Sequence, residues 1–175
     1  MSELPLSMLP FSLSRYEIAG GTGSRSLVIE PLRADHAERL GAGFAAIDPW
    51  ARYPYPASAL EAYFAAEESG APRFAVWLDG ELAGAAGVRL NWLRGPYVQF
   101  LGVLPEFQRR GLGARVLAWI ESEARRGNER NLWVAASDFN VDAIRFYEAQ
   151  GFALVAPLPD LVRDGRTELL LRKRL

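Results

Sequence analysis

The chain has 175 residues, of which 50% are hydrophobic and 23% are charged, and its formal net charge at pH 7 is -1. This length and this apolar content predict one domain that is large enough to bury a substantial core. Because a nucleic-acid-binding domain is expected to carry a strong excess of basic residues, the near-neutral charge argues against a nucleic-acid partner. The absence of cysteine excludes disulfides, thiolate nucleophiles and cysteine-based metal sites.

His36 is the only histidine, so the chain has few residues from which to build a multi-histidine metal site or a serine-type triad. We therefore expect no bound metal. We expect His36 to be a solvated helix residue, because Asp35 and Glu38 beside it resemble a capping box. No apolar run is long enough to span a membrane, and residues 1–11 lack the basic start of a signal peptide. We therefore expect no membrane association and a cytoplasmic location.

The first 25 residues show no sustained periodicity and end in a glycine-rich run. We interpret residues 1–25 as an N-terminal extension with a flexible joint, and residues 26–175 as the single domain. Residues 26–30 predict a first strand. Residues 35–46 predict a helix with its apolar side chains on one face.

A loop rich in proline and aromatic residues follows at 48–56, and its prolines forbid a continuous helix. Its aromatic side chains are Trp50, Tyr53 and Tyr55. These rings could line the mouth of a substrate pocket or could cover the core as a hydrophobic lid. Residues 58–69 then predict a second helix.

The rest of the chain alternates strand and helix patterns. Residues 73–78 and 81–90 flank Asp79-Gly80, a two-residue turn that favours a β-hairpin. The later patterns predict strands over 97–103 and 131–136, helices over 112–126 and 141–150, and a last strand pair over 152–158 and 167–172. Hairpins imply antiparallel strands and crossovers imply parallel ones, so we predict an α/β fold whose mixed sheet carries helices on both faces.

The turn between the strand at 97–103 and the helix at 112–126 has the sequence Gln-Arg-Arg-Gly-Leu-Gly. The first amides of a helix have no acceptor inside it, and glycines let a ligand approach them closely. With the adjacent arginines, this pattern predicts a phosphate or pyrophosphate cradle. The spacings of a nucleoside-triphosphate loop and of a dinucleotide fingerprint are both absent. On the glycines alone, an ordinary basic strand-to-helix turn is the alternative.

Three motifs occur in a characteristic order. The strand ends in Leu-Gly-Val-Leu-Pro, the Gln-x-x-Gly-x-Gly turn follows, and Asn-x-x-Ala-x-x-Phe-Tyr-Glu-x-x-Gly-Phe begins at residue 140. Together these motifs resemble the GNAT superfamily of N-acetyltransferases, which use acetyl-CoA. The resemblance covers residues 97–152 in motif and about 26–175 in architecture.

The resemblance implies a site for acetyl-CoA as cosubstrate. In this family the central strand splays from its neighbour at a bulge and pairs with the pantetheine arm, which assigns that role to Leu101, Gly102 and Val103, with Gly102 suited to the bulge. Asn140 resembles the family asparagine that bonds the cofactor arm. The amides expected to hold the pyrophosphate belong to Gln108, Arg109, Arg110, Gly111, Leu112, Gly113 and Ala114.

The resemblance also implies the chemistry. A primary amine attacks the thioester directly in a ternary complex, and backbone amides stabilise the oxyanion that forms. Tyr147 resembles the family tyrosine near the thioester sulfur, so it is the candidate general acid for the leaving thiolate. The alternative for Tyr147 is a core aromatic that only packs against its neighbours.

The expected base is missing from the pattern. Family members often carry a glutamate on the central strand, where this chain has Gln99 and no carboxylate. Asp138 is one substitute, and loss of the proton to water is another. A non-catalytic acyl-CoA-binding or sensing module therefore remains the second class of function.

The acceptor is expected to be a small-molecule or peptide amine with a hydrophobic part. Family acceptor pockets are built from the N-terminal helices, their loop and the last hairpin, which here assigns substrate contacts to Trp50, Tyr53, Tyr55 and Trp92. Many relatives are dimers, and no feature of the sequence decides between a monomer and a homodimer.

Overall fold

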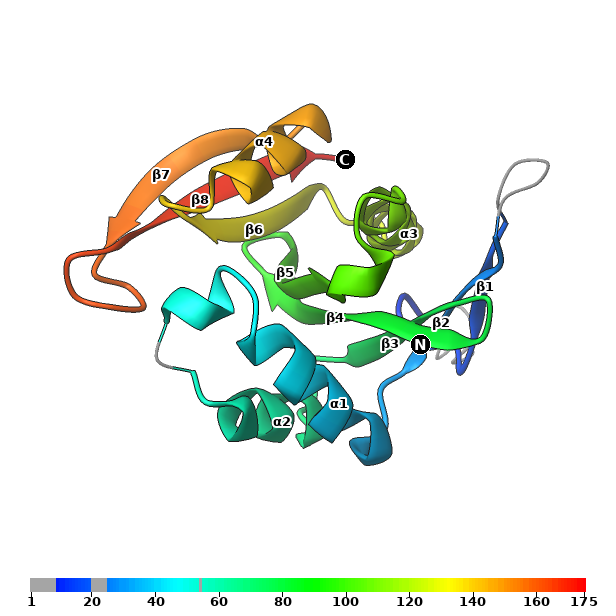
Figure 1. Cartoon of the computed structure of the whole chain (residues 1–175). Coiled ribbons are helices and arrows are strands. Elements are labelled where there is room, and N and C mark those ends of the chain that lie inside the picture. Colours follow the sequence, from blue (N-terminus) through cyan, green and yellow to red (C-terminus); the bar gives the residue numbers. More distant parts are fainter. Residues whose placement is uncertain (1–8, 20–24, 54) are drawn as a thin grey trace.

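The computed structural model describes residues 9–19, 25–53 and 55–175, and the strands among them form one sheet (Figure 1). The order across the sheet is β1-β2-β3-β4-β5-β6-β8-β7. Only β5 and β6 are parallel neighbours, while every other neighbouring pair is antiparallel. The strands are β1 Tyr16–Ile18, β2 Leu27–Pro31, β3 Arg73–Leu78, β4 Glu81–Trp92, β5 Gly95–Val103, β6 Asn131–Ser137, β7 Ala153–Pro159 and β8 Thr167–Arg174.

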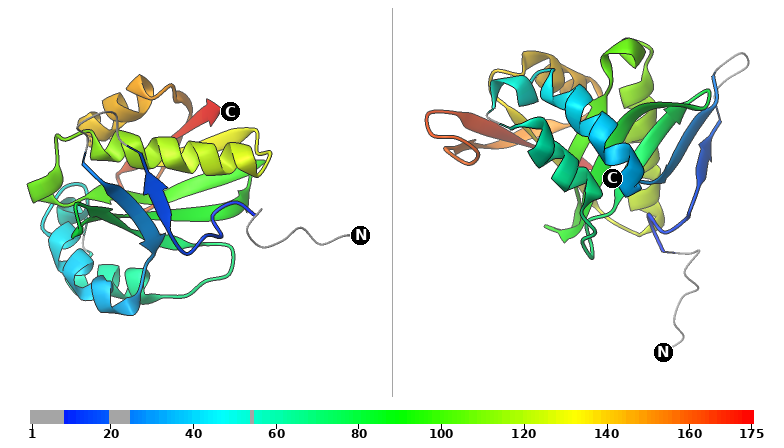
Figure 2. Two further views of the ribbon diagram at one scale, coloured as in Figure 1. Left: turned by 90° about the vertical axis from the view of Figure 1, so that its right-hand side faces the viewer. Right: turned by 60° about the horizontal axis from the view of Figure 1, so that its bottom comes forward.

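Helices cover both faces of this sheet, which confirms the predicted mixed α/β architecture. One face carries α1 and α2, and the other carries α3 and α4 (Figures 1 and 2). The helices are α1 Ala34–Ala45, α2 Ala57–Ala65, α3 Leu112–Arg126 and α4 Val141–Ala149, with short 3-10 turns at η2 Trp50–Arg52 and η3 Pro105–Phe107.

The helical apolar stripes predicted from the sequence face the sheet. In α3, Val116, Leu117 and Ile120 are at most 1% exposed, as their spacing on one helix face requires. In α1, Leu40 and Phe44 are fully buried. A Cβ added at Gly41 would lie 2.8 Å from a backbone oxygen of α2, so this glycine allows α1 and α2 to pack closely.

Part of the expected N-terminal extension packs on the sheet. Strand β1 pairs with β2 in register from Tyr16↔Ile29 to Ile18↔Leu27. Phe11 and Tyr16 are each only 7% exposed. The glycine-rich run at 20–24, expected to be a flexible joint, lies outside the described residues.

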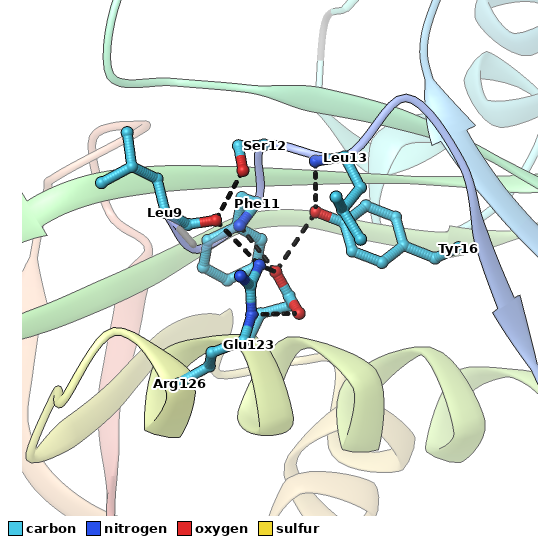
Figure 3. A network of polar contacts seen from close by, with 7 residues as sticks. All are labelled: Leu9, Phe11, Ser12, Leu13, Tyr16, Glu123 and Arg126. Carbon is cyan, nitrogen blue, oxygen red and sulfur yellow. Dashed lines mark hydrogen bonds and ion pairs between the residues drawn. The ribbon is translucent and has the colours of Figure 1, made fainter. Parts of the chain in front are cut away.

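A buried carboxylate on α3 holds this N-terminal segment in place (Figure 3). Glu123 accepts hydrogen bonds from the Phe11 N–H at 2.7 Å and from the Tyr16 hydroxyl at 3.2 Å. Arg126, one turn along, pairs with Glu123 and donates to the Leu9 carbonyl at 2.8 Å. Burial raises the pKa of Tyr16, so its hydroxyl stays protonated as a donor. The polar network therefore ties the segment before β1 to the last turns of α3.

His36 differs from the solvated residue that we expected. No side chain caps the N-terminus of α1, whose N-cap residue is Arg33, and Asp35 pairs with Arg33 instead. The His36 side chain is 17% exposed and meets the Trp77 ring edge-on, with the ring centroids 5.1 Å apart. The histidine therefore packs on β3 as part of the helix–sheet contact.

Candidate functional site

The candidate site lies where the two parallel strands separate. Strands β5 and β6 pair only at Tyr97↔Trp133 and Val98↔Val134, although both continue beyond these residues. On its other side β5 stays paired with β4 as far as Val103. The edge of residues 99–103 that faces β6 therefore has no strand partner, as the expected splay requires.

The bulge in β5 lies at Gln99, so the prediction of a bulge at Gly102 is wrong. Opposite β4, Val98 faces Val88 and Phe100 faces Gly87, which leaves Gln99 as the extra residue. Gly102 pairs regularly with Ala85. Packing explains the glycine at position 102 instead, because a Cβ there would lie 2.5 Å from the Phe44 ring.

The turn before α3 presents a run of unpaired backbone donors. Among the described residues, no acceptor receives the N–H groups from Arg109 to Ala114, and the first helical bond in this turn runs from Arg115 to the Gly111 carbonyl at 3.2 Å. Gly111 is the N-cap at φ 72°, without a side-chain cap and with open space around it. These donors lie in consecutive residues at the positive end of the helix dipole, which suits an anion.

Gln108 has a different role from the amides that follow it. Its backbone N–H donates to the Pro105 carbonyl at 3.2 Å, and its side chain donates to the Val103 carbonyl at 3.0 Å. Both donors are therefore used inside the protein, where they tie the turn to the end of β5. The set of free amides begins at Arg109.

A cavity of about 230 Å³ opens between the splayed strands. In Figure 1, α4 lies on one side of these strands and the segment of η2 on the other. Six of the residues expected in the site line this cavity, namely Trp50, Tyr53, Tyr55, Leu101, Asn140 and Tyr147. Its lining includes Trp50, Tyr53, Tyr55, Tyr97, Gln99, Phe100, Leu101, Ser137, Asn140, Tyr147, Leu161, Val162 and Glu168.

The residues expected to hold the pyrophosphate, 108–114, lie outside this cavity, and so do Trp92 and Asp138. Trp92 packs against Tyr97 and Trp133, with ring centroids at 5.0 and 5.3 Å, at the far end of β4. Asp138, considered as a base, is exposed and does not line the cavity. Trp92 lies at the end of the β4–β5 hairpin, away from the splay, which is why it does not line the cavity.

Tyr147 packs among aromatic side chains and also lies at the cavity wall. It is 7% exposed, and its ring meets Phe146 and Phe152 with centroids at 5.1 and 5.5 Å. It also lines the cavity beside β5 and β6. Burial raises the pKa of Tyr147 above its ordinary value, so the phenol stays protonated at neutral pH and can donate a proton.

Asn140 serves as the N-cap of α4. Its Oδ1 accepts a hydrogen bond from the Ala143 N–H at 3.2 Å. The side-chain amide nitrogen makes no hydrogen bond with the described residues. Asn140 therefore fixes the start of the helix that carries Tyr147 and keeps one donor at the cavity wall.

The aromatic loop covers the core, and its rings also line the cavity. Trp50 stacks on Phe100 with the ring centroids 4.6 Å apart, and it meets the buried Phe44 at 5.1 Å. Tyr53 is 7% exposed, whereas Tyr55 is 40% exposed at the outer end. The wall of the cavity on this side is therefore aromatic.

Glu168 is the functional candidate that the sequence analysis missed. It is 7% exposed at the start of β8, beside Ser137 on β6, which is 4% exposed. The Ser137 hydroxyl donates to Glu168 Oε1 at 2.8 Å, and the Tyr53 hydroxyl donates to the same oxygen. Burial and this bond raise the pKa of Tyr53 to about 12. An acidic residue directly before the apolar run Leu169–Leu171 was the available signal.

The described residues contain no group of three or more acidic, histidine or cysteine side chains that could hold a metal ion. No helix within the same residues is both long and apolar enough to cross a membrane.

Residues 34–152 match the family described as acetyltransferase (GNAT) family. No protein with a curated description matches the chain. Nourseothricin acetyltransferase, a solved structure, is 27% identical at a TM-score of 0.55, over 61% of this chain and 66% of that chain. The match therefore spans just under two thirds of that protein.

Two further solved structures share the fold at lower identity. An acetyltransferase from Thermus thermophilus is 18% identical at a TM-score of 0.71, over 91% of this chain and 100% of that chain. A GNAT family acetyltransferase from Elizabethkingia anophelis with acetyl-CoA bound is 13% identical at a TM-score of 0.57, over 61% of this chain and 78% of that chain.

Proposed function

The chain belongs to the GNAT family of acetyltransferases, and on this premise we propose that it transfers the acetyl group of acetyl-CoA to a primary amine. The observation that carries the proposal is a pair of features, one along β5 and one in the turn that follows it. One is the run of free amides from Arg109 to Ala114, and the other is the cavity in the strand splay that Tyr147 lines.

The residues present fit acetyl-CoA. The amides from Arg109 to Ala114, with the charges of Arg109 and Arg110, would hold the pyrophosphate. The unpaired edge of β5 from Leu101 to Val103 would pair with the amides of the pantetheine arm. When bound, acetyl-CoA supplies an activated acetyl thioester.

The chain's own residues then act on protons and charge. The neutral amine nitrogen attacks the thioester carbonyl carbon, and backbone donors of β5 stabilise the oxygen that becomes negative. As the carbon–sulfur bond breaks, the Tyr147 hydroxyl gives its proton to the sulfur. The cavity reaches from the side of α4 to the side of η2, so the amine can enter from the face opposite α4.

The second candidate is an acyl-CoA-binding module without turnover, which the exposed Gln99 favours because β5 carries no carboxylate. The two functions separate in one experiment. The protein is titrated with acetyl-CoA by calorimetry, and then mixed with a panel of primary amines that includes nourseothricin. An assay for free thiol reports CoA release. Binding with CoA release supports the transferase, binding without it supports the module, and no binding at millimolar acetyl-CoA refutes both.

The acceptor in this proposal is a small-molecule or peptide amine. Chromatography with light scattering would decide between a monomer and a homodimer. Cell fractionation would test the cytoplasmic location expected from the sequence.

A further inference from the structure

Glu168 is the only charged side chain among the described residues that line the cavity. The remaining lining consists of apolar, aromatic, hydroxyl and amide groups. A buried carboxylate in such surroundings is costly unless a cation or several donors compensate it. The groups that offset the charge of Glu168 therefore indicate what the cavity can bind.

The compensation inside the protein is incomplete. The hydroxyls of Tyr53 and Ser137 both donate to one carboxylate oxygen, Oε1. Oε2 accepts no hydrogen bond from the described residues, and no lysine or arginine among them pairs with Glu168. A molecule in the cavity can therefore donate a hydrogen bond to Glu168 Oε2, which accepts none from the described residues.

The walls around this carboxylate select for a cation as well. Trp50, Tyr53, Tyr55, Tyr97 and Phe100 all line the same cavity. The faces of aromatic rings attract an ammonium group and gain more when the site is partly desolvated. An anionic group would meet both the carboxylate and these ring faces unfavourably.

We propose that Glu168 binds the ammonium group of the acceptor and accepts its proton before attack, so that the cavity selects cationic primary amines with an apolar body. This inference rests on the proposed transferase function and adds the base that β5 lacks. It places the base on β8, held by a tyrosine and a serine from other elements.

The protons balance as follows. One N–H bond of the ammonium breaks and an O–H bond forms on Glu168, which leaves a neutral amine. Its lone pair forms the new bond to the acetyl carbon, the carbon–sulfur bond breaks, and the thiolate takes the Tyr147 proton. The nitrogen then gives a second proton to the Tyr147 oxygen, and Glu168 releases its proton to solvent. The products are the amide, CoA thiol and one proton.

The groups that face Glu168 are hydroxyls. They are Tyr53 from the aromatic loop, Ser137 from β6, and Tyr97 from β5, with Tyr147 on α4 beside Tyr97. Asp138 follows Ser137 but is exposed and outside the cavity. Burial raises the pKa of Tyr97 as it does that of Tyr147, so both phenols stay neutral.

A binding experiment tests selection directly on the full chain saturated with CoA. The probes are phenethylamine, tyramine and hexylamine, each compared with its matched alcohol by ligand-observed NMR at pH 7. We expect each ammonium probe to bind at least about 10-fold more tightly than its alcohol. Glu168→Gln should reduce this difference to the part that the aromatic rings supply, because its carbonyl oxygen keeps both hydroxyl bonds but carries no charge. Glu148→Gln removes the same charge from an exposed position on α4, and this variant should keep the preference for ammonium probes.

A kinetic experiment tests proton transfer on the best acceptor of the amine panel. We expect Glu168→Gln to lower kcat/KM at pH 7 on the order of 100-fold. The variant should regain activity as the pH approaches the pKa of the amine, while its affinity for acetyl-CoA stays unchanged. A purely structural role for Glu168 would not produce this recovery.

The outcomes separate the two proposals. A wild-type protein that shows no preference for ammonium probes, or a Glu168→Gln variant that transfers acetyl at the wild-type rate, overturns the inference and leaves the transferase standing. A wild-type protein that binds ammonium probes selectively but releases no CoA overturns the transferase and, with it, the proton transfer to an attacking amine.

Discussion

Replacing Gly111 by tryptophan separates the cofactor cradle from ordinary backbone strain. Gly111 has φ 72° and Gly70 has φ 77°, and a Cβ at either position would meet no atom within 4 Å. Both substitutions therefore carry the same left-handed strain, about 1 to 2 kcal/mol. The matched variant Gly70→Trp lies in the turn before β3, away from the cradle.

The two variants should differ only in cofactor affinity. Gly111 sits among the free amides from Arg109 to Ala114, so a bulky side chain there displaces an anion from these donors. A hydrogen bond to a charged group contributes about 1.5 to 3 kcal/mol, so losing one or two of them weakens acetyl-CoA binding about 10- to 1,000-fold or more. We expect Gly70→Trp to bind normally.

Calorimetric titration with acetyl-CoA measures the affinities, and thermal unfolding measures the strain. We expect both variants to lose the same few degrees in melting temperature and only Gly111→Trp to lose affinity. If Gly111→Trp binds acetyl-CoA as Gly70→Trp does, the amides before α3 are not the pyrophosphate site.

Four further predictions concern the site and its support. Tyr147→Phe should lower turnover on the order of 100-fold with unchanged acetyl-CoA affinity; equal turnover in steady-state kinetics would reduce this residue to packing. Gly102→Ala should destabilise the fold by about 1 to 3 kcal/mol in urea unfolding, because its Cβ meets the Phe44 ring at 2.5 Å, whereas Gly113→Ala should be tolerated at 3.6 Å from the nearest ring. Glu123→Ala should cost about 3 kcal/mol and expose the amides of β1 to hydrogen exchange; protection as in wild type would contradict the network of Figure 3. Melting temperature should hold below pH 10 and fall above it, because buried tyrosines such as Tyr63, whose pKa burial raises to about 12, must stay protonated in the folded chain while the unfolded chain ionises near 10.

Local patterns determined the elements and the free amides before α3. Helix α3 follows from apolar residues at helical spacing, and the β3–β4 hairpin follows from Asp79-Gly80, because both signals lie within one element or one turn. The free amides before α3 were predicted for the same reason, since the first turn of any helix leaves its donors without acceptors. Such features need no information from distant parts of the chain.

The tertiary structure decided which distant residues meet. Tyr53 and Glu168 are 115 positions apart, and no pattern in either segment indicates that they share a hydrogen bond. Strand register placed the bulge at Gln99 instead of Gly102, since a bulge depends on the pairing with β4 and not on the glycine alone. Hairpin length carried Trp92 away from the cavity, and pairing with β2 brought residues 16–18 into the sheet. Local sequence specifies an element's type and its apolar face, whereas strand order, register and packing assemble the carboxylate, hydroxyls and rings into one cavity.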